Sequence, residues 1–315
     1  MTGLQPFGIE PALKERVWGG SRLGQHDPPY GEAWIVYDQA MIACGAHAGM
    51  TLAELAAAHP AAFLGQRVVD AEGAVFPLLI KLLDPAGWLS IQVHPDDELA
   101  RELEGAGFRG KTEAWYVLEA EPGAEIIAGV RAGTSSEDAI GGIGDGSLEL
   151  LLERHEVREG DALLVEAGLI HALGPGVFIY EVQQNSDLTY RVSDWGRPAS
   201  AGRQLHLEQS QRASKPWLRP QFAPMVKRLP NGSFRVLGCD YFDLVLVDSE
   251  GIAIERNTAG RSFETVTIIR GSAELVCQET RLTLGHYQSA VVPAATGAYR
   301  LEGAEPFRAL VSLVP

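Results

Sequence analysis

The chain has 315 residues, of which 46% are hydrophobic and 21% are charged, a balance that is typical of folded globular proteins and excludes a disordered chain. Acidic residues outnumber basic ones by 41 to 26, so the net charge of −15 repels phosphate backbones and disfavours nucleic-acid binding. Since the sequence shows no apolar run of about 18 residues, no secretory signal and no cysteine pairing pattern, we expect a cytoplasmic protein without a membrane span or disulfides.

Four segments carry helix signals. The clearest is a capping box, Thr51-Leu-Ala-Glu54, which opens an Ala-rich amphipathic stretch that Pro60 interrupts and Gly65 closes. A second helix is predicted over residues 95–102, because proline and acidic residues favour a first helical turn. Weaker patterns predict helices over residues 147–155 and 205–214.

Most of the remaining sequence consists of short β-prone runs separated by glycine. In the first two thirds the predicted strands are 88–93, 114–118, 125–130, 162–165 and 177–182. After Pro220 the pattern is almost purely β, and the predicted strands are 234–237, 242–247, 265–269, 273–277, 289–292, 299–301 and 309–313. Many short strands with glycine turns indicate a mainly β protein built as an antiparallel sandwich or barrel, with a few helices in the N-terminal two thirds.

A proline-rich stretch, residues 213–230, is predicted to connect two bodies. We therefore expect a catalytic, metal-binding domain over residues 1–215 and a β-rich domain without metal ligands over residues 230–315. A weak internal echo is consistent with a duplicated barrel. Glu159-Gly-Asp161 and Leu284-Gly-His286 each precede a short apolar strand.

Three short segments carry candidate metal ligands. Gln92 and His94 lie two residues apart at a strand end, so their side chains share one face, although a lone histidine there is more often structural. Glu113 opens an apolar strand just after Lys111, and a carboxylate is costly to bury unless it is paired or metal-bound. Taken alone, these two residues would form a solvated ion pair. His171 is expected on a strand that follows another strand and a tight turn.

Together these side chains form a mixed nitrogen and oxygen donor set. Such a set suits a borderline divalent ion such as Zn²⁺ and leaves a position for water or substrate, as in a catalytic site. No cysteine lies near these segments, which disfavours a closed structural zinc site. Their wide separation matches no short regular pattern, so spacing alone does not identify the site.

Cationic residues supply the candidates for anion binding. Arg191 lies among polar and aromatic residues, where it either pairs with an aspartate beside a turn or faces a pocket and stabilises an oxyanion or phosphate. Lys81 interrupts an apolar run, residues 77–83, and either snorkels to the surface or points into a cavity. Because the overall field is negative, an anionic substrate needs such local cations.

Several motifs follow one another along most of the chain. They are Val17-Trp-Gly-Gly20, Gly31-Glu-Ala-Trp34, Pro77-Leu-Leu-Ile-Lys-Leu-Leu-Asp84, Ser90-Ile-Gln-Val-His-Pro-Asp-Asp97, Gly110-Lys-Thr-Glu-Ala-Trp-Tyr116, Gly168-Leu-Ile-His-Ala172 and Thr189-Tyr-Arg-Val-Ser-Asp194. Gln-Val-His-Pro followed by Thr-Tyr-Arg-Val is specific as a pair. Through these motifs the sequence resembles the type I mannose-6-phosphate isomerase (phosphomannose isomerase) family in its shorter bacterial form, within the cupin superfamily.

This resemblance implies cupin-type antiparallel β-barrels of the jelly-roll kind and an enzyme that interconverts mannose 6-phosphate and fructose 6-phosphate. It also implies one Zn²⁺ per chain. The ion would be held by His94, Glu113 and His171, with Gln92 as a further ligand, and Arg191 would be the active-site arginine. Beyond residue 220 the sequence matches the family only in its general cupin character.

Isomerisation through a cis-enediol moves a proton between C2 and C1 and needs a base, an electrophile and a grip on the phosphate. We expect Arg191 to stabilise the developing negative charge, and Lys81 and Lys111 to bind the phosphate end. The base stays open between Lys111, a water on the metal, Asp187 and Glu32.

Two other functions are compatible with the same residues. One is a non-catalytic metallo-cupin that binds a sugar phosphate, and the other is a different cupin enzyme such as an iron-dependent oxygenase. In each case the expected partner is a small molecule rather than nucleic acid or membrane, and the protein is expected to be a monomer or a homodimer.

Overall fold

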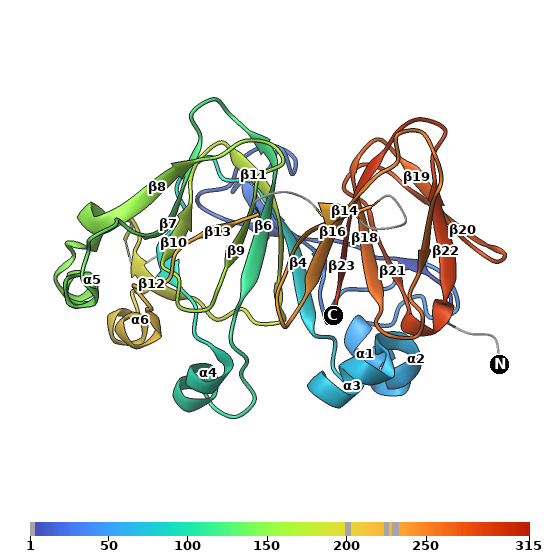
Figure 1. The fold of residues 1–315 in the computed structure, drawn as a ribbon, viewed down its shortest axis with the longest axis horizontal. Helices are drawn as coiled ribbons and strands as arrows, with labels where there is room; N and C mark the ends of the chain where they lie inside the picture. Colours follow the sequence, from blue (N-terminus) through green and yellow to red (C-terminus); the bar gives the residue numbers. More distant parts are fainter. Residues whose placement is uncertain (1–3, 199–202, 224–226, 229–232) are drawn as a thin grey trace. The chain divides into compact units, whose positions relative to one another are not determined.

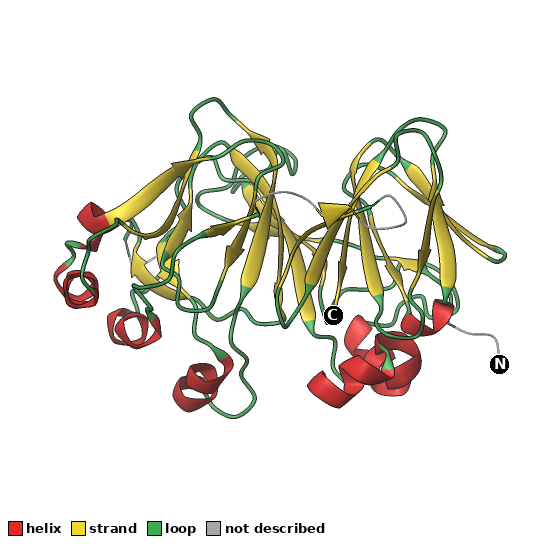
Figure 2. Cartoon of the chain, in the orientation of Figure 1, coloured by secondary structure: helices red, strands yellow, loops and turns green. Residues whose placement is uncertain are grey.

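Antiparallel β-sheets dominate the computed structural model, which describes residues 4–198, 203–223, 227–228 and 233–315 (Figure 2). The chain divides into two compact units. The first unit comprises the described residues of Leu13–Ala33 and Lys81–Ala223, and the second unit those of Met1–Ala12, Trp34–Ile80 and Pro224–Pro315. The chain passes from one unit to the other within β2 (Ala12–Glu15), β3 (Tyr30–Val36) and β4 (Leu78–Leu83).

The first unit contains a five-stranded sheet and most of a seven-stranded one. The smaller sheet has the order β12-β5-β10-β7-β8, formed by Tyr190–Ser193, Ile91–Val93, His171–Leu173, Glu125–Val130 and Leu152–Glu156. The larger sheet has the order β13-β9-β6-β11-β4-β3-β2, in which the first four strands are Gln221–Phe222, Ala162–Val165, Glu113–Ala120 and Val177–Gln184. Buried side chains from both sheets, among them Trp115, Ile126 and Ile179, form one core cluster.

The second unit is also built from two sheets. Its larger sheet has the order β1-β21-β18-β23-β16-β15-β14, formed by Phe7–Gly8, Ser289–Val292, Glu264–Arg270, Arg308–Leu313, Asp243–Asp248, Phe234–Gly238 and Lys227–Arg228. The smaller sheet has the order β17-β22-β19-β20, formed by Ile254–Asn257, Ala298–Glu302, Ala273–Cys277 and Thr280–Leu284. Val266 and Leu275, one from each sheet, belong to a shared core cluster.

The two units repeat one strand order (Figure 1). Adding 12 to each strand number from β2 to β11 gives its counterpart in the second unit, so β6 corresponds to β18 and β10 corresponds to β22. The edge strand β13 corresponds to β1, and β12 lies at the edge of its sheet without a counterpart among the described strands. The two segments of the sequence echo precede β9 and β21, which are such counterparts.

The helices are formed by segments of the chain that connect the strands. They are α1 (Leu52–Ala58), α2 (Pro60–Leu64), α3 (Gln66–Glu72), α4 (Asp97–Glu104), α5 (Ser136–Asp145) and α6 (Leu207–Ala213), with 3₁₀ turns η1 (Leu148–Leu151) and η3 (Ala294–Thr296). The capping box at α1 is present, since the Glu54 amide donates to Thr51 Oγ1 at 3.1 Å and the Thr51 amide donates to Glu54 Oε2 at 2.8 Å. None of the described helices is long and apolar enough to cross a membrane.

Several sequence predictions need correction or extension. The helix predicted over residues 147–155 is wrong, because this segment forms η1 and then β8, whose alternating side chains pair with β7. Helices α3 and α5 were not expected. The predicted domain limits stay a prediction, and the contact-based units differ from them, because residues 34–80 group with the second unit. The predicted connection over residues 213–230 falls partly outside the described residues, at 224–226 and 229–230.

Candidate metal centre

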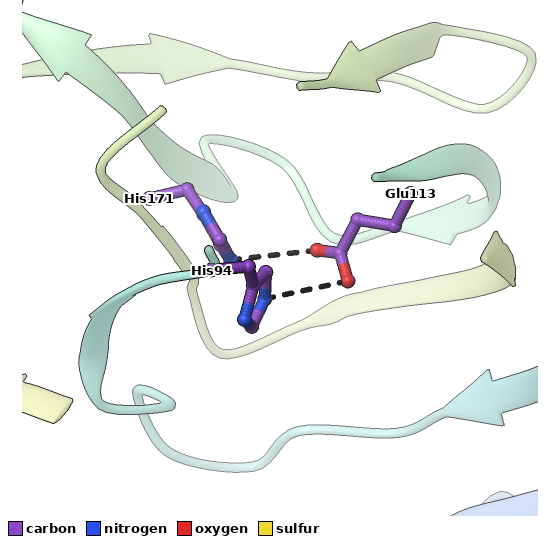
Figure 3. Close-up of side chains that lie close together, drawn as sticks. All are labelled: His94, Glu113 and His171. Atoms are coloured by element: carbon purple, nitrogen blue, oxygen red, sulfur yellow. Dashed lines mark ion pairs between the residues drawn. The ribbon is translucent and has the colours of Figure 1, made fainter. Parts of the chain in front are cut away.

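Three buried side chains from three strand ends converge in the first unit (Figure 3). His94 directly follows β5, Glu113 is the first residue of β6 and His171 is the first residue of β10. Strands β5 and β10 are neighbours in the smaller sheet, whereas β6 belongs to the larger one. One potential ligand atom from each residue lies within 4.8 Å of the others, so the predicted metal ligands form one cluster.

The two imidazoles face the carboxylate with their Nε2 atoms. Glu113 Oε1 lies 3.4 Å from His171 Nε2, and Glu113 Oε2 lies 3.5 Å from His94 Nε2 (Figure 3). The opposite ring nitrogens are occupied, because His94 Nδ1 lies 2.9 Å from the Leu188 carbonyl oxygen and His171 Nδ1 lies 2.8 Å from that of Leu169. Such backbone contacts place the ring proton on Nδ1 and leave the Nε2 lone pair directed at the cluster.

The protonation states suit a cation. Burial, followed by the Lys111 ammonium, lowers the pKa of His94 to about 3, and burial also lowers the pKa of His171. Burial alone would raise the pKa of Glu113, but the Lys111 ammonium is the largest of the opposing causes, and that pKa lies well below its usual value. Neutral imidazoles and an ionised carboxylate therefore face each other as acceptors.

A divalent ion fits this arrangement. His94 Nε2 and Glu113 Oε1 are buried and have no hydrogen-bond partner among the described residues. Buried acceptors without partners are costly, and a cation between them removes that cost. Two imidazole nitrogens and a carboxylate are a common protein donor set for Zn²⁺ at catalytic sites.

Gln92 lies at the edge of the cluster. It pairs in register with His171, and its Nε2 lies 3.2 Å from His171 Nε2. Ser90 Oγ donates to Gln92 Oε1 at 3.2 Å. The amide therefore lies next to one of the three candidate ligands, and its coordination of an ion stays a prediction.

Two buried lysine–carboxylate pairs lie beside the cluster. Lys111 Nζ is 2.8 Å from Glu113 Oε2, and Lys81 Nζ is 3.3 Å from Glu181 Oε1. The indole of Trp115 donates to Glu181 Oε2 at 2.9 Å. Burial opposes the charge on Lys111, but Glu113 and Glu181 outweigh it and raise its pKa, whereas burial and the nearby Glu113 raise the pKa of Glu181.

Sequence reasoning did not single out Glu181. This residue is the acid within the otherwise apolar first six residues of β11, all of which are buried. A single acid in a buried strand is the same signal that drew attention to Glu113. For Lys81 the structure decides between the two alternatives, because its side chain points inward to Glu181 and is only 5% exposed.

A pocket of about 480 Å³ collects the predicted substrate and catalytic residues. Its lining includes Lys81, Gln92, Lys111, Asp187 and Arg191, together with Glu32, Glu181, Arg203 and His206. Lys111 and Gln92 also contact the metal cluster, so the pocket leads to it. This volume falls in the range of small-molecule sites, roughly 300–1,000 Å³.

Arg191 occupies a distinctive place in the pocket. On the neighbouring strands β12, β5 and β10, Arg191 pairs with Gln92 and Gln92 pairs with His171. Its Nη1 donates to the Gln204 carbonyl oxygen at 2.9 Å, and its buried Nε has no partner among the described residues. Burial, followed by the charge of Arg203, lowers the pKa of Arg191.

Two of the acids near the pocket, Asp194 and Glu32, are already paired with arginines. Arg203 makes two hydrogen bonds with Asp194, at 2.6 and 2.7 Å, so this aspartate pairs with Arg203 rather than forming the Arg191–aspartate pair weighed from the sequence. Glu32 is held by Arg16 at 2.8 and 3.1 Å. Asp187 is exposed and lines the pocket.

Comparisons with known proteins find matches over most of the chain. Residues 7–126 match a family model described as phosphomannose isomerase type I, catalytic domain. Over 315 aligned residues the chain is 35% identical to a protein named probable mannose-6-phosphate isomerase GmuF of Bacillus subtilis (strain 168), with 95% of this chain and 96% of that protein covered.

Solved structures show the same fold. A crystal structure of the mannose 6-phosphate isomerase from Bacillus subtilis matches with a TM-score of 0.86 and 32% identity, covering 98% of this chain and 99% of that one. A mannose 6-phosphate isomerase bound with zinc and yttrium matches with a TM-score of 0.76 over 98% of this chain and 99% of that one, and at 17% identity it shows the shared fold alone. The predicted cupin-type, mainly β fold is thereby confirmed.

Proposed function

This chain belongs to the type I phosphomannose isomerase family and is an isomerase, and from this premise we propose that it interconverts mannose 6-phosphate and fructose 6-phosphate. The observation that carries the proposal is the cluster of His94, Glu113 and His171, whose ligand atoms lie within 4.8 Å of one another. The pocket lined by Lys111 and Arg191 leads to this cluster and offers positive charge to a sugar phosphate in a chain of net charge −15.

We propose that one Zn²⁺ per chain is held by His94, Glu113 and His171, with Gln92 as a further ligand. The neutral imidazoles and the ionised carboxylate support this assignment, since each presents an acceptor to the same buried space. When bound, the ion supplies a Lewis acid that polarises the substrate oxygens at C1 and C2.

Proton transfer between C2 and C1 through a cis-enediol needs a base within the pocket. Lys111 is ion-paired with Glu113, and Glu32 is held by two hydrogen bonds from Arg16. The carboxylate of Asp187 is exposed and lines the pocket, so it can accept a proton from a bound sugar. Among the three candidate side chains, we therefore assign the base to Asp187.

The cations of the pocket take the anionic parts of the substrate. Arg191 lies in register beside Gln92, so its guanidinium can stabilise the charge that develops on O1 and O2. Lys81 and Lys111 line the same pocket and are assigned to the substrate's hydroxyl and phosphate oxygens. Each lysine is oriented by its buried carboxylate partner, which limits the movement of its side chain.

Conversion of mannose 6-phosphate by the purified protein tests the proposal. The protein is stripped of metal with a chelator, assayed, and assayed again after Zn²⁺ is returned. Turnover that vanishes and returns with the ion supports both the substrate and the metal. Turnover that survives demonstrated metal removal contradicts the metal assignment. A zinc-loaded protein that does not convert mannose 6-phosphate contradicts the substrate assignment.

We also propose a cytoplasmic location. All three cysteines, Cys44, Cys239 and Cys277, are unpaired, which is usual in a reducing compartment. The choice between a monomer and a homodimer stays a prediction.

A further inference from the structure

The repeated strand order gives every residue of the metal cluster a counterpart in the second unit. Glu113 is the first residue of β6, and Glu264 is the first residue of its counterpart β18. Glu113 pairs with Val165, the last residue of β9, and Glu264 pairs with Val292, the last residue of β21. The second unit therefore retains a glutamate at the position of the glutamate in the metal cluster.

The other cluster positions hold different residues. In the first unit His171 of β10 pairs with Gln92 of β5, whereas in the second unit Tyr299 of β22 pairs with Arg256 of β17. His94 directly follows β5, and Thr258 directly follows β17 in the same way. The counterparts of Gln92, His94 and His171 are thus Arg256, Thr258 and Tyr299.

Three of these counterparts form a closed buried network. Arg256 Nε donates to Glu264 Oε2 at 2.7 Å and lies 3.0 Å from the Tyr299 hydroxyl. The Tyr299 hydroxyl in turn donates to Glu264 Oε2. The side chains of Arg256 and Glu264 are each 7% exposed, so this ion pair lies in the interior of the second unit.

The charges of the network balance without an ion. A buried carboxylate requires a cation or several hydrogen-bond donors. Glu264 obtains both from the guanidinium and the tyrosine hydroxyl, whereas Glu113 has the Lys111 ammonium at one oxygen and faces imidazole nitrogens that offer lone pairs. The position two residues before Glu264 is Ser262, so the counterpart of Lys111 brings no charge.

We infer that the Arg256–Glu264–Tyr299 network is a counterpart of the metal centre in which a guanidinium takes the place of the divalent cation. The second unit therefore binds no ion in this chain, and the metal content is that of the first unit alone. The inference rests on the proposed function only for the identity of the first unit's ion.

Restoring the ligands tests this inference directly. A variant with Arg256→Gln, Thr258→His and Tyr299→His combines the restored side chains with the resident Glu264. After incubation with Zn²⁺ and removal of free ion, we expect its metal content to exceed that of the unsubstituted chain by one ion. The same variant with Glu264→Gln is the matched control and should lose this gain.

The gain in zinc content is measured relative to the unsubstituted chain, so this test does not depend on mannose 6-phosphate turnover. A folded triple variant whose zinc content equals that of the unsubstituted chain overturns the inference. Failure of the proposed function would instead appear as an unsubstituted chain without turnover, whatever the triple variant binds.

A double-mutant cycle measured by thermal unfolding provides a second test, which does not require a new metal site to be built. Arg256→Met leaves the Glu264 carboxylate without its cation, and we expect the Tm to fall by about 10 °C, the scale of a broken buried ion pair in a unit of this size. Adding Glu264→Gln should recover at least half of that loss. An equal loss with and without Glu264→Gln contradicts the inference, and Arg281→Met, at an exposed ion pair of the same unit, should change the Tm little.

Discussion

The two units of the chain place a glutamate at the same point of the same strand order, but they neutralise it differently. Glu113 pairs with the Lys111 ammonium at 2.8 Å and faces two imidazole lone pairs beside the pocket that Lys111 lines, whereas Glu264 is closed off by a guanidinium and a phenol. Under the two proposals above, the fold supplies a position and the neighbouring side chains decide whether that position binds an ion. Function therefore belongs to the site rather than to the fold.

The largest expected effect comes from removing one imidazole of the metal centre. His171→Ala should abolish metal binding and lower turnover roughly a thousandfold or more, because a catalytic ion supplies several kcal/mol of transition-state stabilisation. Metal analysis and the isomerase assay measure the two losses, and the circular dichroism spectrum should stay β-rich.

The counterpart substitution in the second unit is the matched control for His171→Ala. Tyr299→Phe removes the hydroxyl of the Arg256–Glu264–Tyr299 network and keeps the ring, so metal content and turnover should be unchanged. Loss of metal in Tyr299→Phe would break the comparison, since it would place an ion in the second unit.

The second prediction separates the ion from the arginine. Arg191→Ala should keep the metal but lower kcat by about 10²–10³, the cost of removing one donor that stabilises developing negative charge. Steady-state kinetics together with metal analysis checks this outcome. Full activity in this variant would remove Arg191 from the mechanism, and loss of the ion would make it a structural support of the centre.

The extent to which the sequence predicted this site depends on the residue. Glu113 and His94 stand out because an acid opens an apolar strand and a histidine follows a strand beside Gln92. Their convergence with His171 depends on the register of β10 with β5 and on the position of β6 in the other sheet, which no local pattern specifies. The motifs of the resembled family supplied that long-range information.

The fold was predicted best where short apolar runs are bounded by polar residues, glycine or proline. Strands β7, β9, β19 and β21 have the predicted limits. Strand β10 has three residues, too few to show a period of two, and its presence at His171 was predicted from the preceding strand and tight turn, without limits. The helix predicted over residues 147–155 was wrong because pairing with β7 determines the conformation of the segment, whatever its local propensity.

The third prediction asks whether Lys81 neutralises a buried carboxylate in the first unit, as Arg256 does in the second. Lys81→Met leaves Glu181 buried without its cation, which should lower the free energy of unfolding by about 3–5 kcal/mol. Adding Glu181→Gln should restore most of the stability but not the turnover, because Lys81 is also assigned to the substrate. Denaturant unfolding and the isomerase assay measure the two properties, and recovery of both would make Lys81 purely structural.

The smallest expected effect lies in a helix of the second unit. Thr51→Ala removes the side-chain oxygen that caps α1 and should lower the free energy of unfolding by about 1 kcal/mol. Metal content and kcat should be unchanged, because the capping box is exposed and none of its atoms lines the pocket. Thr51→Ser keeps the capping oxygen and should retain nearly all of the stability. A fall in kcat with the ion still bound would show that the second unit influences catalysis. Catalysis could then no longer be assigned to the first unit alone.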